Sequence, residues 1–231
     1  MPSKRYKKAL ELVDGKKAHP LKDAVSVLAK FPKAKFNETI DLAFRLGVDP
    51  KQSDQMVRGT VPLPHGSGKT VRVLVFAKSG AAADAAKAAG AEFVGFEDMI
   101  AKCNSGWADF DVAVATPEAM AEVRKLGKIL GPRGLMPNPK TGTVTDDTAK
   151  AVKEVKAGRV EFKVDKAGNI HVPVGKASFT ATQIEENARA VIEAVAKAKP
   201  SSAKGTYICS CTLSATMSPP VRVDVREFAA H

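Results

Sequence analysis

Residues 65–76 read HGSGKTVRVLVF, and this stretch decides how the chain is divided. Its first half resembles the end of a phosphate-binding loop, but Leu63 stands where that loop requires its first glycine. The loop also requires a helix that begins at Lys69, because the free N–H groups of a helix N-terminus hold the phosphate. Residues 71–76 are instead a β-branched run typical of a strand. The stretch therefore predicts a flexible glycine joint ahead of a new domain.

After this joint, strands and helices alternate along the chain. We expect strands at residues 71–76, 92–94 and 110–115, and helices at 81–89, 96–103, 117–126 and 146–156. The alternation predicts a small parallel sheet covered by helices, a Rossmann-like three-layer α/β domain over residues 68–158. The dinucleotide fingerprint G-x-G-x-x-G is missing from its first turn, which reads AKSGAAADAAKAAG. The fold alone therefore indicates no function and no cofactor.

The two ends of the chain show a different pattern, in which strands bury one face only. Such strands are expected at residues 36–46, 56–63, 160–164, 170–174, 204–213 and 221–225, and amphipathic helices at 5–13, 21–31 and 182–199. Residues 160–164 and 170–174 flank a turn at 165–168 and predict a hairpin. The two ends together predict one α+β domain, an antiparallel sheet backed by helices.

The fold class is therefore α/β, with a first domain split between residues 1–67 and 159–231 and a second domain inserted at 68–158. Two connections join these domains, and both contain glycine. Gly66, Gly68 and Gly158 are the predicted hinge, because paired short linkers rich in glycine permit rotation.

The composition is that of a globular chain, with 231 residues of which 44% are hydrophobic. No apolar run is long enough to span a bilayer, and the N-terminus lacks the apolar core of a signal peptide, so we expect a cytoplasmic protein without a membrane partner. Cys103, Cys209 and Cys211 fit neither a disulfide framework nor a zinc site, and no metal is expected. Cys209 and Cys211 are predicted to point the same way on a strand, as small residues of the core or of an interface.

The net charge of +11 favours a polyanionic partner. Residues 1–67 carry 13 basic and 7 acidic groups and residues 159–231 carry 10 and 7, whereas residues 68–158 carry 13 and 11. The two flanking segments thus share a net charge of +9, and the middle has +2. This distribution predicts that the flanks form one basic surface.

The least ordinary segment is GPRGLMPNPKTG at residues 131–142, whose prolines and glycines exclude regular structure. With its neighbours it reads KILGPRGLMPNPKTGTVT and resembles the signature of the family of the large ribosomal subunit's stalk protein, protein L-one, in its bacterial form. Further motifs in that family's order are Phe36-Asn-Glu-Thr39, Asp49-Pro50, Ser53-Asp-Gln55, Val57-Arg-Gly-Thr60, Leu63-Pro-His-Gly66, Asp165-Lys166, Gly168 with Ile170-His171, Gly175-Lys-Ala-Ser-Phe179 and Thr216-Met217. The resemblance covers nearly the whole chain.

The resemblance implies a two-domain structural protein of the large ribosomal subunit, monomeric when free and without enzymatic activity. It implies binding to ribosomal RNA at the mobile stalk beside the tRNA exit site, help in releasing deacylated tRNA, and repression of translation through its own operon mRNA. It places the RNA-binding surface on Lys35, Phe36, Glu38, Thr39, Arg45, Asp165, Lys166, His171, Gly175, Lys176, Ser178, Thr216, Met217 and Ser218. Arg133 and Lys140 are candidates for an RNA contact of the second domain.

The chemistry of these residues suits RNA. Lysines can neutralise phosphates and so release counterions, namely Lys35, Lys166 and Lys176. Hydroxyls can bond to 2′-OH groups and phosphate oxygens, namely those of Thr39, Ser178 and Thr216. The side chains of Phe36 and Met217 can pack against sugars or an exposed base.

Several of these residues also have a simpler interpretation, which the sequence leaves open. Phe36 can belong to the core, His171 can face solvent, and Glu38 can either accept hydrogen bonds from RNA or pair with a neighbouring lysine. Ser218 departs from the family's Thr-Met-Gly-Pro pattern. Because serine lacks the freedom of glycine at positive φ, we expect either a negative φ at Ser218 or a shifted loop.

Two other functions compete with RNA binding. The GSGKT stretch and the α/β middle suggest a nucleotide-dependent enzyme, which lacks a complete phosphate loop, a metal cluster and a nucleophile–histidine–acid grouping. Charge alone would also suit a DNA-binding regulator, but no helix-turn-helix or zinc motif supports one.

Overall fold

The computed structural model describes residues 3–15, 17–78 and 80–228, without the side chains of Lys140 and Glu227. The chain divides into two compact units. Unit 1 takes Met1–Gly68 and Gly158–His231, and unit 2 takes Lys69–Ala157. The two ends of the chain thus fold into one body, and the middle forms another.

Unit 1 is built on a four-stranded antiparallel sheet in the order β7-β1-β8-β9. Its strands are β1 (Thr39–Leu46), β7 (Asn169–Lys176), β8 (Ile208–Ala215) and β9 (Val221–Val223). Along β1 buried and less buried side chains alternate, and Ile40, Leu42, Phe44 and Leu46 are the buried ones. The period of two therefore gives the sheet one core face and one outer face.

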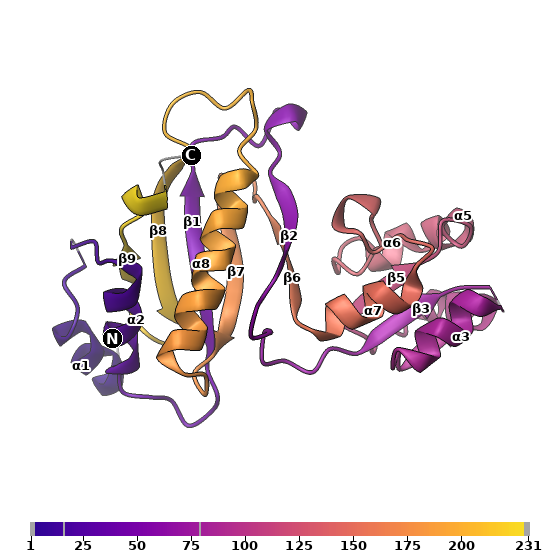
Figure 1. The fold of residues 1–231 in the computed structure, drawn as a ribbon, viewed down its shortest axis with the longest axis horizontal. Helices are drawn as coiled ribbons and strands as arrows, with labels where there is room; N and C mark the ends of the chain where they lie inside the picture. Colours follow the sequence, from indigo (N-terminus) through magenta and orange to yellow (C-terminus); the bar gives the residue numbers. More distant parts are fainter. Residues whose placement is uncertain (1–2, 16, 79, 229–231) are drawn as a thin grey trace. The chain divides into compact units, whose positions relative to one another are not determined.

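Helices cover the core face of this sheet (Figure 1). They are α2 (Leu21–Ala29) and α8 (Ala181–Lys197), while α1 (Lys4–Glu11) lies beside them at the N-terminus. Helix α8 begins with a capping box, in which Thr180 and Gln183 satisfy each other's free backbone N–H groups. Its Ile184, Val191 and Val195 are buried at the spacing of one helical face.

The predicted hairpin around residues 165–168 is wrong. Strand β6 (Arg159–Lys163) pairs with β2 (Arg58–Pro62) in a separate two-stranded sheet, whereas β7 pairs with β1. Each strand has the alternation that a hairpin requires, but the pattern does not choose a partner. The partner of β7 is decided by tertiary packing, because β7 pairs with β1 along Thr39 to Arg45.

The prediction that Cys209 and Cys211 point the same way is also wrong. Cys211 is buried and Cys209 is exposed. The register between β1 and β8 shifts, since Arg45 pairs with Ser210 but Leu46 pairs with Ile208, and Cys209 is the extra residue of the bulge. Burial raises the pKa of the Cys211 thiol to about 12, so this cysteine stays neutral.

Unit 2 has the three layers that the alternating pattern predicts. Its parallel sheet has the order β4-β3-β5, with β3 (Val73–Phe76), β4 (Phe93–Gly95) and β5 (Val112–Ala115). One face packs against α3 (Ala81–Ala88) and α7 (Thr148–Lys156). The other packs against α4 (Glu97–Asn104), α5 (Met120–Val123), the 3₁₀ turn Arg124–Leu126 and α6 (Gly127–Leu130). The predicted α/β class is confirmed, with an antiparallel sheet in unit 1 and a parallel one in unit 2.

The three predicted hinge glycines all have positive φ, namely 69° at Gly66, 68° at Gly68 and 100° at Gly158. A Cβ atom on Gly158 would lie 2.4 Å from the Cα atom of Gly66, so the two connections touch where they leave unit 1. Only glycine fits these positions without strain.

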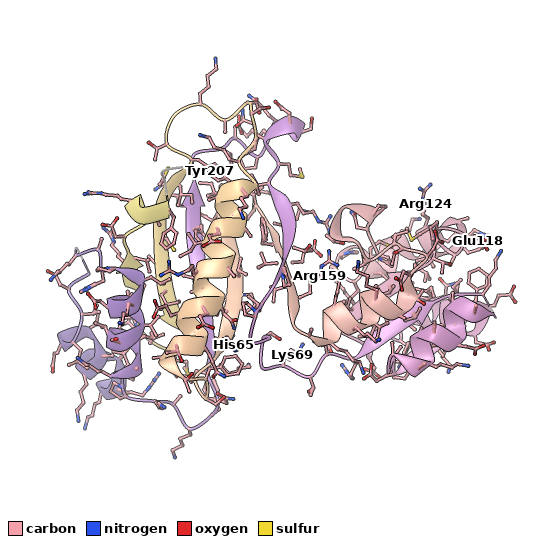
Figure 2. All side chains as sticks on the ribbon, viewed as in Figure 1. His65, Lys69, Glu118, Arg124, Arg159 and Tyr207 are labelled. Atoms are coloured by element: carbon pink, nitrogen blue, oxygen red, sulfur yellow. The ribbon has the colours of Figure 1, made fainter. Side chains whose placement is uncertain are left out.

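Asn187 anchors the first connection to α8. Its side chain is fully buried, accepts a hydrogen bond from the His65 amide at 3.0 Å, and donates to the carbonyls of Gly66 (3.0 Å) and Val174 (2.8 Å). His65 lies against α8, and its Nε2 is 2.5 Å from the Glu186 carboxylate (Figure 2). The backbone therefore stays fixed to unit 1 as far as Gly66.

No helix among the described residues is both long enough and apolar enough to cross a membrane.

Candidate nucleic-acid interface

The candidate interface begins where three neighbouring strands of unit 1 meet. Because β1 runs antiparallel to β7 and β8, the first residue of β1 lies beside the last residues of the other two. Segments far apart in sequence come together there, and most of the residues predicted from the resemblance lie in them. We call this group the strand-end cluster: Phe36, Asn37, Glu38, Thr39, Lys176, Ser178, Thr216, Met217 and Ser218.

Thr39 links the three segments through hydrogen bonds. The ammonium of Lys176 donates to the Thr39 hydroxyl at 2.7 Å. The Thr216 hydroxyl accepts from the Thr39 amide at 3.0 Å, and the Thr216 amide donates to the Thr39 carbonyl at 3.0 Å. These bonds give the cluster a defined shape before any ligand binds, which lowers the entropy lost on binding.

Asn37 is a member of the cluster that sequence reasoning missed. Its amide nitrogen donates to the Ser178 hydroxyl and its amide oxygen accepts from the Ser178 backbone, both at 3.2 Å. It therefore joins the segment before β1 to the segment after β7. The only signal in the sequence was its place in the motif Phe36-Asn-Glu-Thr39, between residues that were selected.

Phe36 and Met217 are the large apolar side chains of the cluster, and both are exposed, with relative accessibilities of 51% and 56%. Neither belongs to the core. Exposed aromatic and thioether groups beside polar ones suit contact with sugars and bases, since every base offers an apolar face.

Glu38 is oriented differently from the rest of the cluster. It is buried, with a relative accessibility of 4%, and its carboxylate lies 3.2 Å from the guanidinium of Arg5. Of the two interpretations that the sequence left open, the described geometry is that of an internal ion pair, formed with an arginine of α1 rather than with a lysine. Arg5 is a second residue that sequence reasoning missed.

Ser218 has a negative φ, because none of the described non-glycine residues has a positive one. Its hydroxyl accepts from the Ala215 amide at 2.9 Å and closes the turn after β8. Gly175 is buried, and a Cβ atom there would lie 2.9 Å from the ring of Phe179. The absence of a side chain at Gly175 thus permits Phe179 to pack under the cluster.

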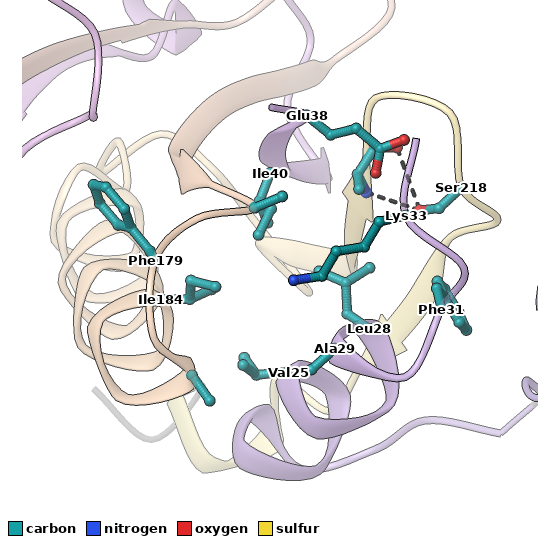
Figure 3. Close-up of a pocket in the computed structure, with 13 residues that line it drawn as sticks. Val25, Leu28, Ala29, Phe31, Lys33, Glu38, Ile40, Phe179, Ile184 and Ser218 are labelled. Atoms are coloured by element: carbon teal, nitrogen blue, oxygen red, sulfur yellow. Dashed lines mark hydrogen bonds between the residues drawn. The ribbon is translucent and has the colours of Figure 1, made fainter. Parts of the chain in front are cut away.

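A small cavity of about 80 Å³ lies beneath the cluster, between α2, α8 and the sheet (Figure 3). Its walls are mainly apolar, with Val25, Leu28, Ile40 and Ile184 among the lining residues, and the side chain of Lys33 extends across it. The cavity is too small for a nucleotide, since sites for ligands of that size span about 300–1,000 Å³. The cluster therefore offers a surface rather than a pocket.

The outer face of the sheet continues the surface away from the cluster. It presents the side chains that alternate with the core: Thr39, Asp41, Ala43 and Arg45 of β1, Asn169, His171, Pro173 and Lys176 of β7, and Ser210, Thr212 and Ser214 of β8. We call this group the outer sheet face. Arg45 and His171 are exposed on it. Burial raises the pKa of Asp41, while the charges of His171 and Lys176 act in the opposite direction.

Asp165 and Lys166 lie at the far end of this face. Gly168 of their turn accepts a hydrogen bond from Leu46, the last residue of β1. The length of β1 separates them from the cluster by roughly 20 Å, at about 3.3 Å per residue. The Asp165 carboxylate accepts hydrogen bonds from the amides of Asn169 and Ala167, and these bonds lower its pKa. Asp165 thus shapes the turn that exposes Lys166.

The remaining predicted residue of unit 1 is Lys35, which is exposed in the loop before Phe36. Residues 28–219 of the chain match the ribosomal protein L1p/L10e family.

The chain belongs to the ribosomal protein L1p/L10e family. Members of this family are proteins of the large ribosomal subunit that bind ribosomal RNA, and the chain is accordingly a cytoplasmic, structural component of that subunit. The predicted resemblance is confirmed.

In this L1p/L10e-family protein, the loop at residues 131–142 belongs to unit 2 and is braced from within. The Asn138 amide donates to the Thr143 hydroxyl at 2.8 Å, and the buried Thr141 hydroxyl bonds to the Asn138 carbonyl. Arg133 is exposed on this loop, while the side chain of Lys140 lies outside the part that the structure describes.

The stretch that resembled a phosphate loop has another role in this family member. Residues 69–72 are irregular and lead into β3, and Lys69 donates to the Asp111 carboxylate at 2.6 Å. The crevice at the carboxyl ends of β3 and β5, where related folds place a dinucleotide, is lined by Glu118, Asp146 and Asp147 with one cation, Lys78 (Glu118 is labelled in Figure 2). Among the described lining residues, negative charge prevails and would repel phosphates.

Proposed function

We propose that this ribosomal protein binds a folded segment of large-subunit ribosomal RNA, at the mobile stalk near the tRNA exit site, through the strand-end cluster and the outer sheet face. The observation that carries the proposal is the convergence of three strand ends. It places lysine, hydroxyl and exposed apolar groups side by side on a unit whose net charge is +9. RNA is recognised largely by shape, by phosphate and 2′-OH contacts and by stacking on unpaired bases, and the cluster offers groups for each.

Each group has a defined part in this proposal. Lys176 is half-exposed at the edge of the cluster. Its ammonium can donate a hydrogen bond to a phosphate, either in place of its bond to the Thr39 hydroxyl or in addition to it. Thr39, Ser178 and Thr216 supply hydroxyls whose positions are set by the bonds described above. Phe36 and Met217 cover an exposed base or a sugar. Arg45, His171 and Lys166 extend the contact along the outer sheet face.

A filter-binding titration against a stalk fragment of ribosomal RNA tests the interface. We expect Lys176→Ala to weaken binding about tenfold and to reduce the slope of log K against log salt by about 0.7–0.9, because one phosphate contact is lost. Lys197→Ala is the matched control, since Lys197 is an exposed lysine of the same unit on α8, which covers the opposite face of the sheet. Equal affinities for Lys176→Ala and Lys197→Ala would refute the proposed interface.

We also propose that the same surface binds a similar RNA shape in the leader of the protein's own operon mRNA and so represses translation. Shape-based recognition supports this idea, since two RNAs with one local fold present the same phosphates and 2′-OH groups. The two RNAs should compete for the protein, and Lys176→Ala should weaken both by the same factor. Simultaneous binding of both RNAs would contradict a shared site.

A further part of the proposal concerns tRNA. We propose that the hinge at Gly66, Gly68 and Gly158 lets the two units, the two proposed domains, change their relative orientation while RNA stays bound to unit 1, and that such motion assists release of deacylated tRNA. The positive φ of all three glycines supports a joint without side-chain obstruction. Small-angle scattering with and without the stalk RNA measures the motion, and identical profiles would argue for a fixed arrangement. Arg133 and Lys140 are the proposed RNA contacts of unit 2, and Arg133→Ala should weaken tRNA crosslinking in assembled ribosomes if they act there.

A further inference from the structure

We propose that Arg5 is a positioning residue of the RNA-binding surface, which acts by holding the turn after β8 and the segment before β1 in their binding positions. The inference rests on the proposed RNA-binding function of the strand-end cluster. It assigns a role to α1, an element that contributes no residue to that cluster.

Arg5 joins three segments that are distant in sequence. One guanidinium nitrogen donates to the Pro32 carbonyl at 3.0 Å and to the Glu38 carboxylate at 3.2 Å. The other donates to the Met217 carbonyl at 2.7 Å. Helix α1, the loop before β1 and the turn after β8 therefore share one side chain, across separations of up to 212 residues.

The two ends of this link belong to, or directly adjoin, residues proposed to meet RNA. The carbonyl that Arg5 holds belongs to Met217, between the hydroxyl residues Thr216 and Ser218. The carboxylate that it neutralises belongs to Glu38, which directly precedes Thr39. Loss of the guanidinium would leave the Glu38 carboxylate buried without its partner, which is strongly unfavourable and would drive that segment towards solvent. The turn would at the same time lose one of its anchors.

The shape of the arginine side chain matters as well as its charge. Three acceptors surround the guanidinium in different directions, and a planar fork of five N–H donors can reach all of them. A lysine ammonium at the end of a flexible stem is a single point charge and would reach fewer of them. The side chain of Arg5 is about one quarter exposed (26%), so it is turned mainly towards the protein.

The first test uses the free protein, without RNA. In Arg5→Met, amide hydrogen exchange should accelerate at least tenfold at Thr216 and Ser218, whose amides donate to Thr39 and Ala215 within the tethered segments. Arg226→Met is the control, because Arg226 is highly exposed and lies outside the cluster. Unchanged exchange at Thr216 and Ser218 in Arg5→Met would overturn the proposal, whatever the protein binds.

The second test separates positioning from direct phosphate contact. Arg5→Met should bind stalk RNA about 5–20-fold more weakly with an unchanged salt slope, whereas a lost phosphate contact lowers the slope by about 0.7–0.9. Arg5→Lys should keep most of this defect. Glu38→Gln should weaken binding in the same direction, and the double variant Arg5→Met/Glu38→Gln should be no weaker than Arg5→Met alone, because both changes break one link.

The outcomes are distinct. A reduced salt slope with additive effects of Arg5→Met and Glu38→Gln would make Arg5 a phosphate contact and overturn the positioning role. Full rescue by Arg5→Lys would show that charge alone suffices and would also overturn it. If Arg5→Met fails to fold, Arg5→Lys and Glu38→Gln carry both tests. If the wild-type protein does not bind the RNA, the proposed function fails, while the exchange experiment still decides whether Arg5 orders the turn.

Discussion

Single side chains stabilise the proposed binding surface by hydrogen bonds to its turns and loops. Ser218 replaces the glycine that the family pattern has after Thr-Met, and its hydroxyl bonds to the Ala215 amide and closes the turn. Serine at position 218 thus lacks the backbone freedom of glycine but supplies a side-chain hydrogen bond, and its φ is not positive. A motif match could show that position 218 departs from the pattern, but not which of the two expected consequences would occur.

Asp111 is the residue whose ionisation bears most directly on stability. The pKa of Asp111 is lowered to about 2, mainly by a hydrogen bond from the side chain of Lys69. Burial acts in the opposite direction, and hydrogen bonds from the backbone and side chain of Arg72 lower the pKa further. A carboxyl with a lowered pKa stabilises the fold above its ordinary pKa near 3.8, and this stabilisation is lost as the pH falls towards 2. Asp111→Asn should therefore lower the free energy of unfolding by about 1 kcal/mol at pH 6, allowing for solvent screening.

The measurement can use the single tryptophan of the chain, Trp107, which lies in unit 2 and packs against Phe110. Urea unfolding followed by its fluorescence should show the difference between wild type and Asp111→Asn shrinking between pH 4 and pH 2. Asp109→Asn, a change of charge at an exposed neighbouring aspartate, is the control. A difference that stays constant with pH would contradict the ion-pair explanation.

At the scale of elements, strand pairing depends on contacts that no strand contains by itself. Strands β6 and β7 follow one another in sequence but join different sheets, and bulges in β7 and β8 change which side chains face outward. The ribbon of β2 and β6 closes over Phe162, whose ring lies directly against Gly59 of the opposite strand. The absence of a side chain at Gly59 makes this pairing sterically feasible.

Gly59→Ala should consequently destabilise the ribbon. The new Cβ atom would lie 2.6 Å from the Phe162 ring, so either the ring or the strand must move. We expect a loss of about 1–3 kcal/mol in the free energy of unfolding, the range for an overpacked core position. Gly15→Ala is the matched control in the same unit, because a Cβ atom there meets nothing within 4 Å. Urea denaturation followed by circular dichroism compares the two, and equal midpoints would exclude steric conflict at Gly59.

At the scale of the whole molecule, two chain ends form one basic unit and the middle forms a second unit that is nearly neutral. The chain passes between these units twice, at residues 68–69 and 157–158. The fully buried side chain of Asn187 fixes the first passage to unit 1 through two hydrogen bonds, to His65 and Gly66, and its third hydrogen bond goes to Val174 of β7. Rotation at this passage therefore begins beyond the Gly66 carbonyl that Asn187 holds.

Asn187→Ala should destabilise unit 1 and leave unit 2 intact. The Val174 carbonyl, in a buried hydrogen bond, and the partly buried His65 amide and Gly66 carbonyl would lose their partner, so we expect a loss of about 2–4 kcal/mol. Thermal unfolding by circular dichroism should then show an earlier transition for part of the signal, while the transition of Trp107 in unit 2 stays in place. Asn104→Ala, at the end of α4 in unit 2, provides a comparison with an exposed asparagine. A common shift of both signals would mean that the two units unfold together.

The sequence alone determined the class of the fold and the family of the protein. Alternation of apolar residues reports which side of a strand is buried, and the order of strands and helices distinguishes a parallel from an antiparallel arrangement, because these patterns arise within single elements. The motif from Lys128 to Thr145 and its companions identified the family, now confirmed over residues 28–219.

Only the tertiary structure decided which residues of the predicted set lie together. It brought Phe36, Lys176 and Thr216 to one edge, and it left Lys166 at the far end of the outer sheet face. It also turned Glu38 inward to Arg5, a residue that no local sequence pattern marks as part of the surface. The physical reason is that strand partners, bulges and ion pairs between distant segments depend on contacts across the whole chain, which no local pattern encodes.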